Sequence, residues 1–182
     1  MSLRHALLGL LVEGPASGYD LLKIFDSSLV FVWPATQSQL YGELNRLADD
    51  GLIEVTNQGP RGRKDYTLTE QGRAELEHWI LDVEPDRVRR NEALLRVFFL
   101  GTVGRRRAKA YLEREAAAHE NLEQLLGTIA RDTDWEANDF TRFGHLVIES
   151  GLRYAHTQAQ WAHWAATQIN DHDNNESPAP TH

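Results

Sequence analysis

Apolar residues recur at helical spacing four times near the start of the chain. The first pattern begins at Ser2 and stops at Gly14-Pro15, and the second follows Ser17 and ends before Trp33-Pro34. The third follows Thr36 and ends at Gly51, and the fourth follows Thr69, with Leu76, Trp79 and Ile80 predicted to face inward. Ser and Thr are preferred helix N-caps, and Gly and Pro end helices, so we expect four helices with these limits.

Between the third and fourth predicted helices, the spacing of apolar residues changes from helical to every second residue. The segments "LIEVTNQ" and "KDYTLT" alternate on either side of a Gly-Pro-Arg-Gly turn, which predicts a β-hairpin. Three helices, a hairpin and a fourth helix are the element order of a winged helix-turn-helix domain with a two-stranded wing.

Longer helical patterns follow Glu84-Pro85. They are "NEALLRVFFLG", "GRRRAKAYLEREAAAHENLEQLLGTIA" and "DFTRFGHLVIESGLRYAHTQAQWAHWAATQI". The fold is therefore predicted to be mainly α, with a winged helix-turn-helix domain at 1–84 and a domain of long helices at 85–170, to which the family resemblance given below assigns dimerisation. Residues 171–182 are polar and contain Pro, so we expect a disordered tail there.

Charge and composition narrow the function classes. The chain has a net charge of -8 and no Cys, which excludes disulfides and thiolate chemistry. Neither half is basic, so contact with a polyanion requires a local patch. The apolar runs are shorter than the roughly 20 residues of a membrane span, and the start lacks signal-peptide features. We therefore expect a cytoplasmic protein with no membrane partner.

Three motifs resemble the PadR family of transcriptional regulators. They are "HALLGLLVEGPASGYDLLKIF", "QLYGELNRLADDGLIE" and "RGRKDYTLTEQGRAEL", and "NEALLRVFFLG" with the long helices is similar to the C-terminal region of longer family members. The resemblance implies that the second motif is a recognition helix, that the third contains the wing, and that the C-terminal helices form a homodimer.

The third helix is the first candidate DNA-binding site. Its apolar stripe is Leu40, Leu44 and Leu47, which leaves polar residues for the outer face. Gln and Asn bond adenine edges, and Ser and Tyr suit phosphates. The candidates are Gln37, Ser38, Gln39, Tyr41, Asn45 and Arg46. A plain solvated helix face is the alternative, chiefly for Asn45 and Arg46.

The hairpin tip is the second candidate DNA-binding site. It carries Arg61, Arg63 and Lys64 within four residues of an otherwise acidic chain. Solvated loop charge is the alternative for an isolated cluster. In a wing beside a recognition helix, these cations are placed to neutralise phosphates or enter the minor groove.

Aromatic residues of the last helix are candidates for an effector site. Trp161 and Trp164 lie three residues apart, and Tyr154 lies two turns earlier. In relatives with effectors, aromatics at the dimer interface line an apolar pocket, which implies a small aromatic effector; interhelical packing is the alternative. His156 and His163 lack ligand spacing with a carboxylate, so we expect no metal and no cofactor.

Catalytic motifs are absent from the sequence. There is no G-x-S-x-G, Walker A or G-x-G-x-x-G pattern, so we do not expect an enzyme. The predicted function is a sequence-specific regulator, acting as a ligand-responsive repressor that binds a palindromic double-stranded operator as a homodimer. The alternative is a winged-helix protein-interaction module without specific DNA binding, with which the acidic first half is consistent.

Overall fold

The computed structural model describes residues 2–29, 32–58, 64–86 and 90–169. The chain divides into two compact units, Met1–Arg87 and Val88–His182, each with its own core. The expected tail at 171–182 lies outside the described residues. None of the helices in the described ranges is long and apolar enough to cross a membrane.

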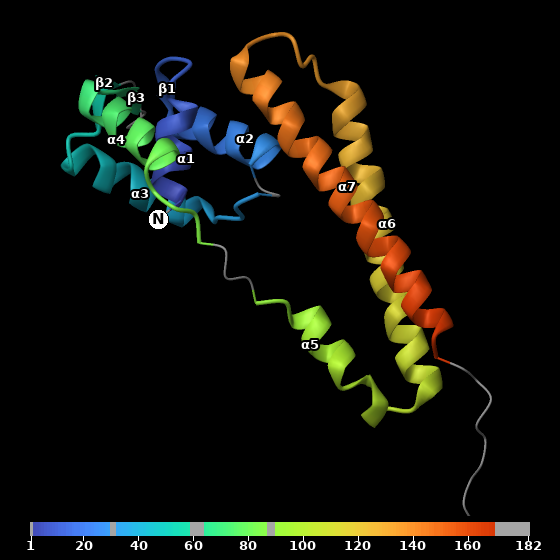
Figure 1. Ribbon diagram of the computed structural model, residues 1–182. Helices are drawn as coiled ribbons and strands as arrows, with labels where there is room; N and C mark the ends of the chain where they lie inside the picture. The colour runs from blue at the N-terminus through green and yellow to red at the C-terminus, as the bar shows by residue number, and fades with distance from the viewer. Residues whose placement is uncertain (1, 30–31, 59–63, 87–89, 170–182) are drawn as a thin grey trace, which may run out of the picture. The chain divides into compact units, whose positions relative to one another are not determined.

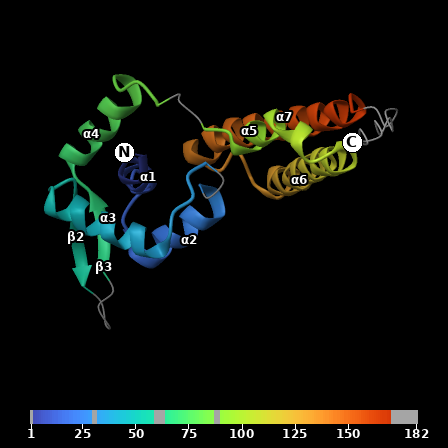
Figure 2. The same ribbon diagram turned by 90° about the horizontal axis from the view of Figure 1, so that it is seen from below.

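Four helices form the first unit (Figures 1 and 2). They are α1 (Ser2–Leu10), α2 (Gly18–Ser28), α3 (Gln37–Asp49) and α4 (Glu70–Leu81). Their apolar stripes meet in a core that includes Leu7, Leu21, Phe25, Leu44 and Leu47, all fully buried. The stripes predicted from spacing are therefore the buried faces, as expected for amphipathic helices.

The sheet has one strand more than predicted. The hairpin of β2 (Ile53–Gln58) and β3 (Lys64–Leu68) is confirmed, but β1 (Ala16–Ser17) pairs antiparallel with β3 in the order β1-β3-β2. A two-residue strand has no readable period, so sequence patterning could not predict it. The pairing ties the start of α2 to the base of the wing.

Side-chain caps set the starts of three helices, as predicted. The Asp20 amide donates to Ser17 Oγ over 3.2 Å. Thr36 and Gln39 form a reciprocal capping box, the second of its two bonds running from the Thr36 amide to Gln39 Oε1 over 2.8 Å. Thr69 Oγ accepts from the Gly72 amide and faces the carbonyls of Gly51 and Leu52 at 2.8 and 2.9 Å, so it joins α4 to the start of β2.

The outer side of α4 differs from the prediction. Leu76 is buried, and the Trp79 ring stacks on His5 of α1 with centroids 4.4 Å apart. Ile80, predicted to face inward, is 61% exposed in the single chain. The apolar spacing of a helix does not by itself say how wide its covered face is, and here only one edge of α4 meets α1.

The second unit contains α5 (Glu92–Phe98), a short 3-10 turn at Leu100–Thr102 (η2), α6 (Arg105–Asp132) and α7 (Asp139–Thr167). Figures 1 and 2 show α6 and α7 side by side as an antiparallel pair. Small residues line the seam: Ala108 and Ala116 on α6, and Ala155, Ala159, Ala162 and Ala166 on α7, all buried. Small side chains let two helix backbones approach closely, which explains a straight pairing of two long helices.

Candidate nucleic-acid interface

The amino-terminal end of α3 is built to present polar side chains. The capping box fixes the first turn, while Leu40 and Leu44 anchor the opposite face in the core. Gln37 and Ser38 are exposed, and no hydrogen bond joins either side chain to another described residue. Both are therefore available to an external partner at the turn that enters the major groove in helix-turn-helix proteins.

Two other candidates on α3 already have partners within the chain. The Gln39 side chain accepts from the Thr36 amide in the capping box, so its first role is to cap α3. Arg46, the sole cation of α3, donates to Glu43 over 3.0 Å. Arg46 must leave this carboxylate to meet a phosphate, whereas the neighbouring Asn45 is exposed.

Tyr41 links the two helices of the helix-turn-helix. Its ring lies so close to Gly18 at the start of α2 that a Cβ there would be 2.6 Å from Cε1. The ring remains 36% exposed, and its phenol contributes to a raised pKa of the buried Tyr66, after burial itself. Tyr41 thus sets the α2–α3 contact and still reaches the surface.

Tyr19 is a surface residue that the sequence patterns did not single out. It lies in the first turn of α2, next to the Gly18 contact with Tyr41, and is 68% exposed. The signal in the sequence was the aromatic residue itself, because its position lies outside the buried apolar stripe of α2.

The wing is only partly described. Lys64 begins β3 and is exposed, and the neighbouring Asp65 accepts from the Asn57 side chain over 3.2 Å. Arg61 and Arg63 lie outside the described residues. The described strands of the wing therefore carry one cation, Lys64, and two carboxylates, Glu54 and Asp65.

Both units of the chain match models of known protein families. Residues 7–78 match the model of the "Transcriptional regulator PadR-like family", and residues 89–170 match "Virulence activator alpha C-term". The negative transcriptional regulator PadR of Bacillus subtilis is 32% identical over 168 residues, which cover 87% of this chain and 92% of that protein. This chain belongs to the PadR-like family of transcriptional regulators.

Solved structures of the same relative agree with this placement. Bacillus subtilis PadR in complex with operator DNA gives a TM-score of 0.80 at 29% identity, covering 93% of this chain and 100% of that one. Its complex with p-coumaric acid gives 0.79 at 28% identity, with 93% and 99% covered. The predicted fold and family are confirmed: the chain is a winged-helix transcriptional regulator, and the family is not one of enzymes.

The second unit of this PadR-like chain contains a cavity at the predicted effector residues. Trp161 and Trp164 line a space of about 380 Å³ together with Val97, Leu100 and Leu112. Tyr154 does not line it; its ring meets His119 edge-on at 5.8 Å. The structure therefore brings together two of the three predicted effector residues.

The two histidines of α7 face carboxylates on α6. His156 Nδ1 lies 3.1 Å from Glu123, and His163 Nε2 lies 2.8 Å from Glu120. The paired residues are 33 and 43 positions apart in the sequence, so no local motif predicts these contacts. Among the residues with described positions, no group of three or more ligating side chains is arranged to hold a metal ion.

Proposed function

We propose that this PadR-like chain is a repressor that binds a palindromic operator as a homodimer and is released by a small aromatic effector. The observation that carries the proposal is the exposed first turn of α3, where Gln37 and Ser38 are available to a partner. Gln reads adenine edges in the major groove, and Ser suits phosphates. The relative from Bacillus subtilis, whose structure with operator DNA is known, supports this assignment.

Tyr19 and Tyr41 are proposed to hold the DNA backbone next to the recognition turn. Their rings are exposed on adjoining parts of α2 and α3, and a phenol donates well to phosphate oxygen. Arg61, Arg63 and Lys64 are proposed to contact phosphates or the minor groove from the wing. Asn45 and Arg46 lie further along α3. They contact DNA only if the major groove runs alongside this part of the helix as well as its first turn.

The homodimer is proposed to form through the second unit. Large apolar side chains are exposed there in a single chain, and leaving such an area in water is unfavourable. They are Leu94, Leu95, Phe98 and Phe99 around α5 and Phe143, Leu146 and Val147 on α7. A two-fold axis repeats every contact, so two modest patches can form one closed interface.

The effector is proposed to be a flat apolar molecule that binds at Trp161 and Trp164. Indole rings favour stacking on aromatic ligands, and the cavity of about 380 Å³ is within the range of small-molecule sites. Release requires the ligand to bind the form that cannot hold DNA more tightly than the form that can. The known complex of the Bacillus subtilis relative with p-coumaric acid supports an effector of this kind.

Selection of bound duplexes from a random pool tests the proposed function. A two-fold motif should emerge, with half-sites centred about 10 bp apart because two recognition helices one DNA turn apart are separated by about 34 Å. Recovery of no symmetric motif at low salt would instead support the protein-interaction module. A protein acting on chromosomal operators works in the cytoplasm of a bacterial cell, and this localisation is part of the proposal.

A further inference from the structure

Gly42 lies in the middle of the recognition helix, where glycine is unfavourable. Helix α3 runs from Gln37 to Asp49, so Gly42 belongs neither to its first turn nor to its last. Glycine destabilises the interior of a helix more than any residue except proline, because it loses the most backbone freedom on folding. A glycine at this position therefore calls for a structural or functional reason.

The described part of the chain supplies no internal reason for this glycine. Gly42 has the ordinary backbone conformation of its helix, whereas Gly51 after the end of α3 has a φ of +71°. A Cβ at position 42 would meet nothing within 4 Å, in contrast to Gly18, where a Cβ would collide with the Tyr41 ring. Neither backbone conformation nor packing within the described residues requires a glycine at position 42.

Gly42 lies on the outward face of α3. Ser38, Gly42 and Asn45 are spaced by four and three residues, so they share one side of the helix, away from the buried Leu40 and Leu44. Ser38 and Asn45 are exposed, and Gly42 is partly exposed between them. Because Gly42 has no side chain, the helix backbone itself forms the surface at the centre of this face.

We propose that DNA approaches α3 most closely at Gly42, so that the helix lies along the major groove and Asn45 reads a base as well as Gln37, an inference that rests on the proposed DNA-binding function. Glycine allows a helix backbone to come close to a ligand, and a side chain at position 42 would hold α3 away from the base edges. Along the helix axis, Gln37 and Asn45 are about 12 Å apart, which is at most three or four base-pair steps of about 3.4 Å. Asn45 should therefore read a different base pair from Gln37 within the same half-site.

The variant Gly42→Ala, tested on an operator selected from a random pool of duplexes, probes this close approach. We expect the variant to unfold at a urea concentration no lower than the unchanged chain, because alanine favours helix, yet to bind operator about tenfold more weakly or worse. Gly9→Ala is the matched control: it adds the same methyl group to a helix where nothing lies within 4 Å, and it should keep operator affinity. Unchanged operator affinity in the folded Gly42→Ala variant overturns the proposal.

A panel of single-base operator variants tests the role of Asn45. Asn45→Ala should remove the preference at one base pair, distinct from the one affected by Gln37→Ala, and Gly42→Ala should weaken the Asn45-dependent preference more than the Gln37-dependent one. An Asn45→Ala variant with unaltered base preference overturns the proposal, as does a Gly42→Ala variant that loses the same affinity for operator and unrelated duplexes. If the unchanged chain selects no motif at all, the proposed function fails and this inference with it. A selected motif that Gly42→Ala still binds fully refutes the inference alone.

Discussion

The ring of Tyr41 occupies the space above Gly18 that a larger side chain would need. A Cβ at position 18 would lie 2.6 Å from Tyr41 Cε1, so the start of α2 and the recognition helix are fitted to each other through a glycine. Contacts of this length force one partner to move. The exposed ring is the partner that can move, and it lies on the proposed DNA-binding face.

Gly18→Ala should therefore impair DNA binding more than folding. We expect the Tyr41 ring to be displaced, operator affinity to fall, and the free energy of unfolding to drop by about 1–2 kcal/mol. Gly9→Ala is the matched control, because a Cβ there meets nothing within 4 Å. The control should keep operator affinity and gain up to about 1 kcal/mol from helix propensity. Urea unfolding and fluorescence anisotropy with labelled operator measure both effects.

Two glutamines of α3 should behave differently. Gln37→Ala should reduce discrimination at one base pair by roughly 1–3 kcal/mol, because its exposed amide is proposed to read a base edge. Gln39→Ala should instead lower the free energy of unfolding by about 1 kcal/mol through loss of the capping box, while sequence preference is kept. Binding to a panel of single-base operator variants distinguishes the two. A change of base preference with Gln39→Ala alone would contradict the assignment.

The wing cations should strengthen DNA binding regardless of the base sequence of the duplex. Replacement of Arg61, Arg63 and Lys64 by Gln should weaken all duplexes alike and reduce the slope of log K against log salt by up to about 0.9 per lost phosphate contact. Arg73→Gln, on an exposed position of α4, is the control and should leave the slope unchanged. An unaltered slope in the triple variant would place the wing away from the phosphates.

Charge placed on α5 should separate the proposed dimer. Phe98 is 88% exposed in the single chain, so Phe98→Asp should leave each protomer folded while burying a carboxylate in the dimer interface. We expect sedimentation velocity to show monomers and operator affinity to fall. Leu81→Asp makes the same kind of change in the first unit, at a residue 79% exposed, and should remain dimeric.

A fragment ending near Asp82 provides an independent check of the dimer interface. It contains α1 to α4 and the sheet but none of α5, α6 and α7. We expect it to sediment as a monomer and to bind operator weakly. Dimers of this fragment would mean that the first unit supplies the interface.

Alkaline pH should destabilise the first unit through Tyr66. Burial, and then the nearby Tyr41 phenol, raise its pKa above the usual value of 10.0. The unfolded chain therefore loses this proton at lower pH than the folded chain, so stability is unaffected well below pH 10 and falls as pH rises beyond it. Tyr66→Phe should flatten the decline relative to the unchanged chain, as measured by urea unfolding between about pH 8 and 11. Parallel declines would show that Tyr66 does not contribute.

Local signals in the sequence were sufficient for the helix starts and the hairpin. A capping residue and its partner lie three positions apart, so Ser17, Thr36 and Thr69 could be read directly. β1 is too short to show a period, and its pairing with β3 depends on chain segments about 50 residues apart. The exposed face of Ile80 likewise depends on which neighbours α4 meets.

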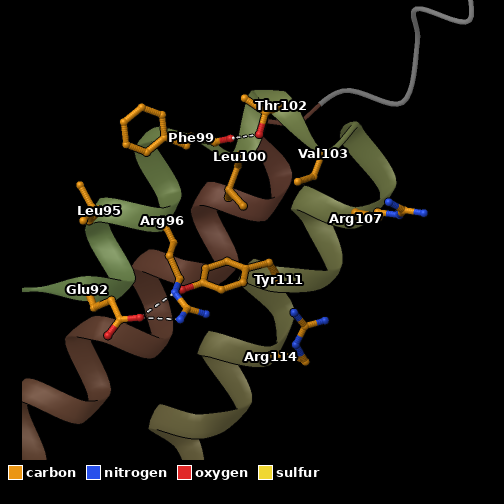
Figure 3. A pocket seen from close by; sticks show the side chains of 10 residues that line it. All are labelled: Glu92, Leu95, Arg96, Phe99, Leu100, Thr102, Val103, Arg107, Tyr111 and Arg114. Atoms are coloured by element: carbon orange, nitrogen blue, oxygen red, sulfur yellow. Dashed lines mark hydrogen bonds and ion pairs between the residues drawn. The ribbon is translucent and has the colours of Figure 1, made fainter.

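The candidate sites were less accessible to sequence reasoning, because their geometry is tertiary. The outward face of α3 and the Thr36–Gln39 capping box were predicted, but the pairing of Arg46 with Glu43 depends on a side-chain choice within the fold. Trp161 and Trp164 share a cavity as their spacing suggested, whereas Tyr154 turns toward His119. A second cavity (Figure 3) is lined by Leu95 of α5 and Tyr111 of α6, which come together across the turn between these helices, and no local sequence pattern predicts it.

The Thr69 hydroxyl lies at the junction of α3, β2 and α4. Its contacts must be conserved, whereas the residues at the tip of the wing are free to diverge. It fixes the base of the wing to the carbonyls of Gly51 and Leu52 and to the first turn of α4, several residues from the hairpin tip. Mutational drift at the tip therefore leaves the placement of the recognition helix intact. Descendants of such a chain can change the strength and salt dependence of DNA binding by exchanging wing residues, whereas a change at this one threonine disturbs the base of the wing and the start of α4 together and is removed by purifying selection.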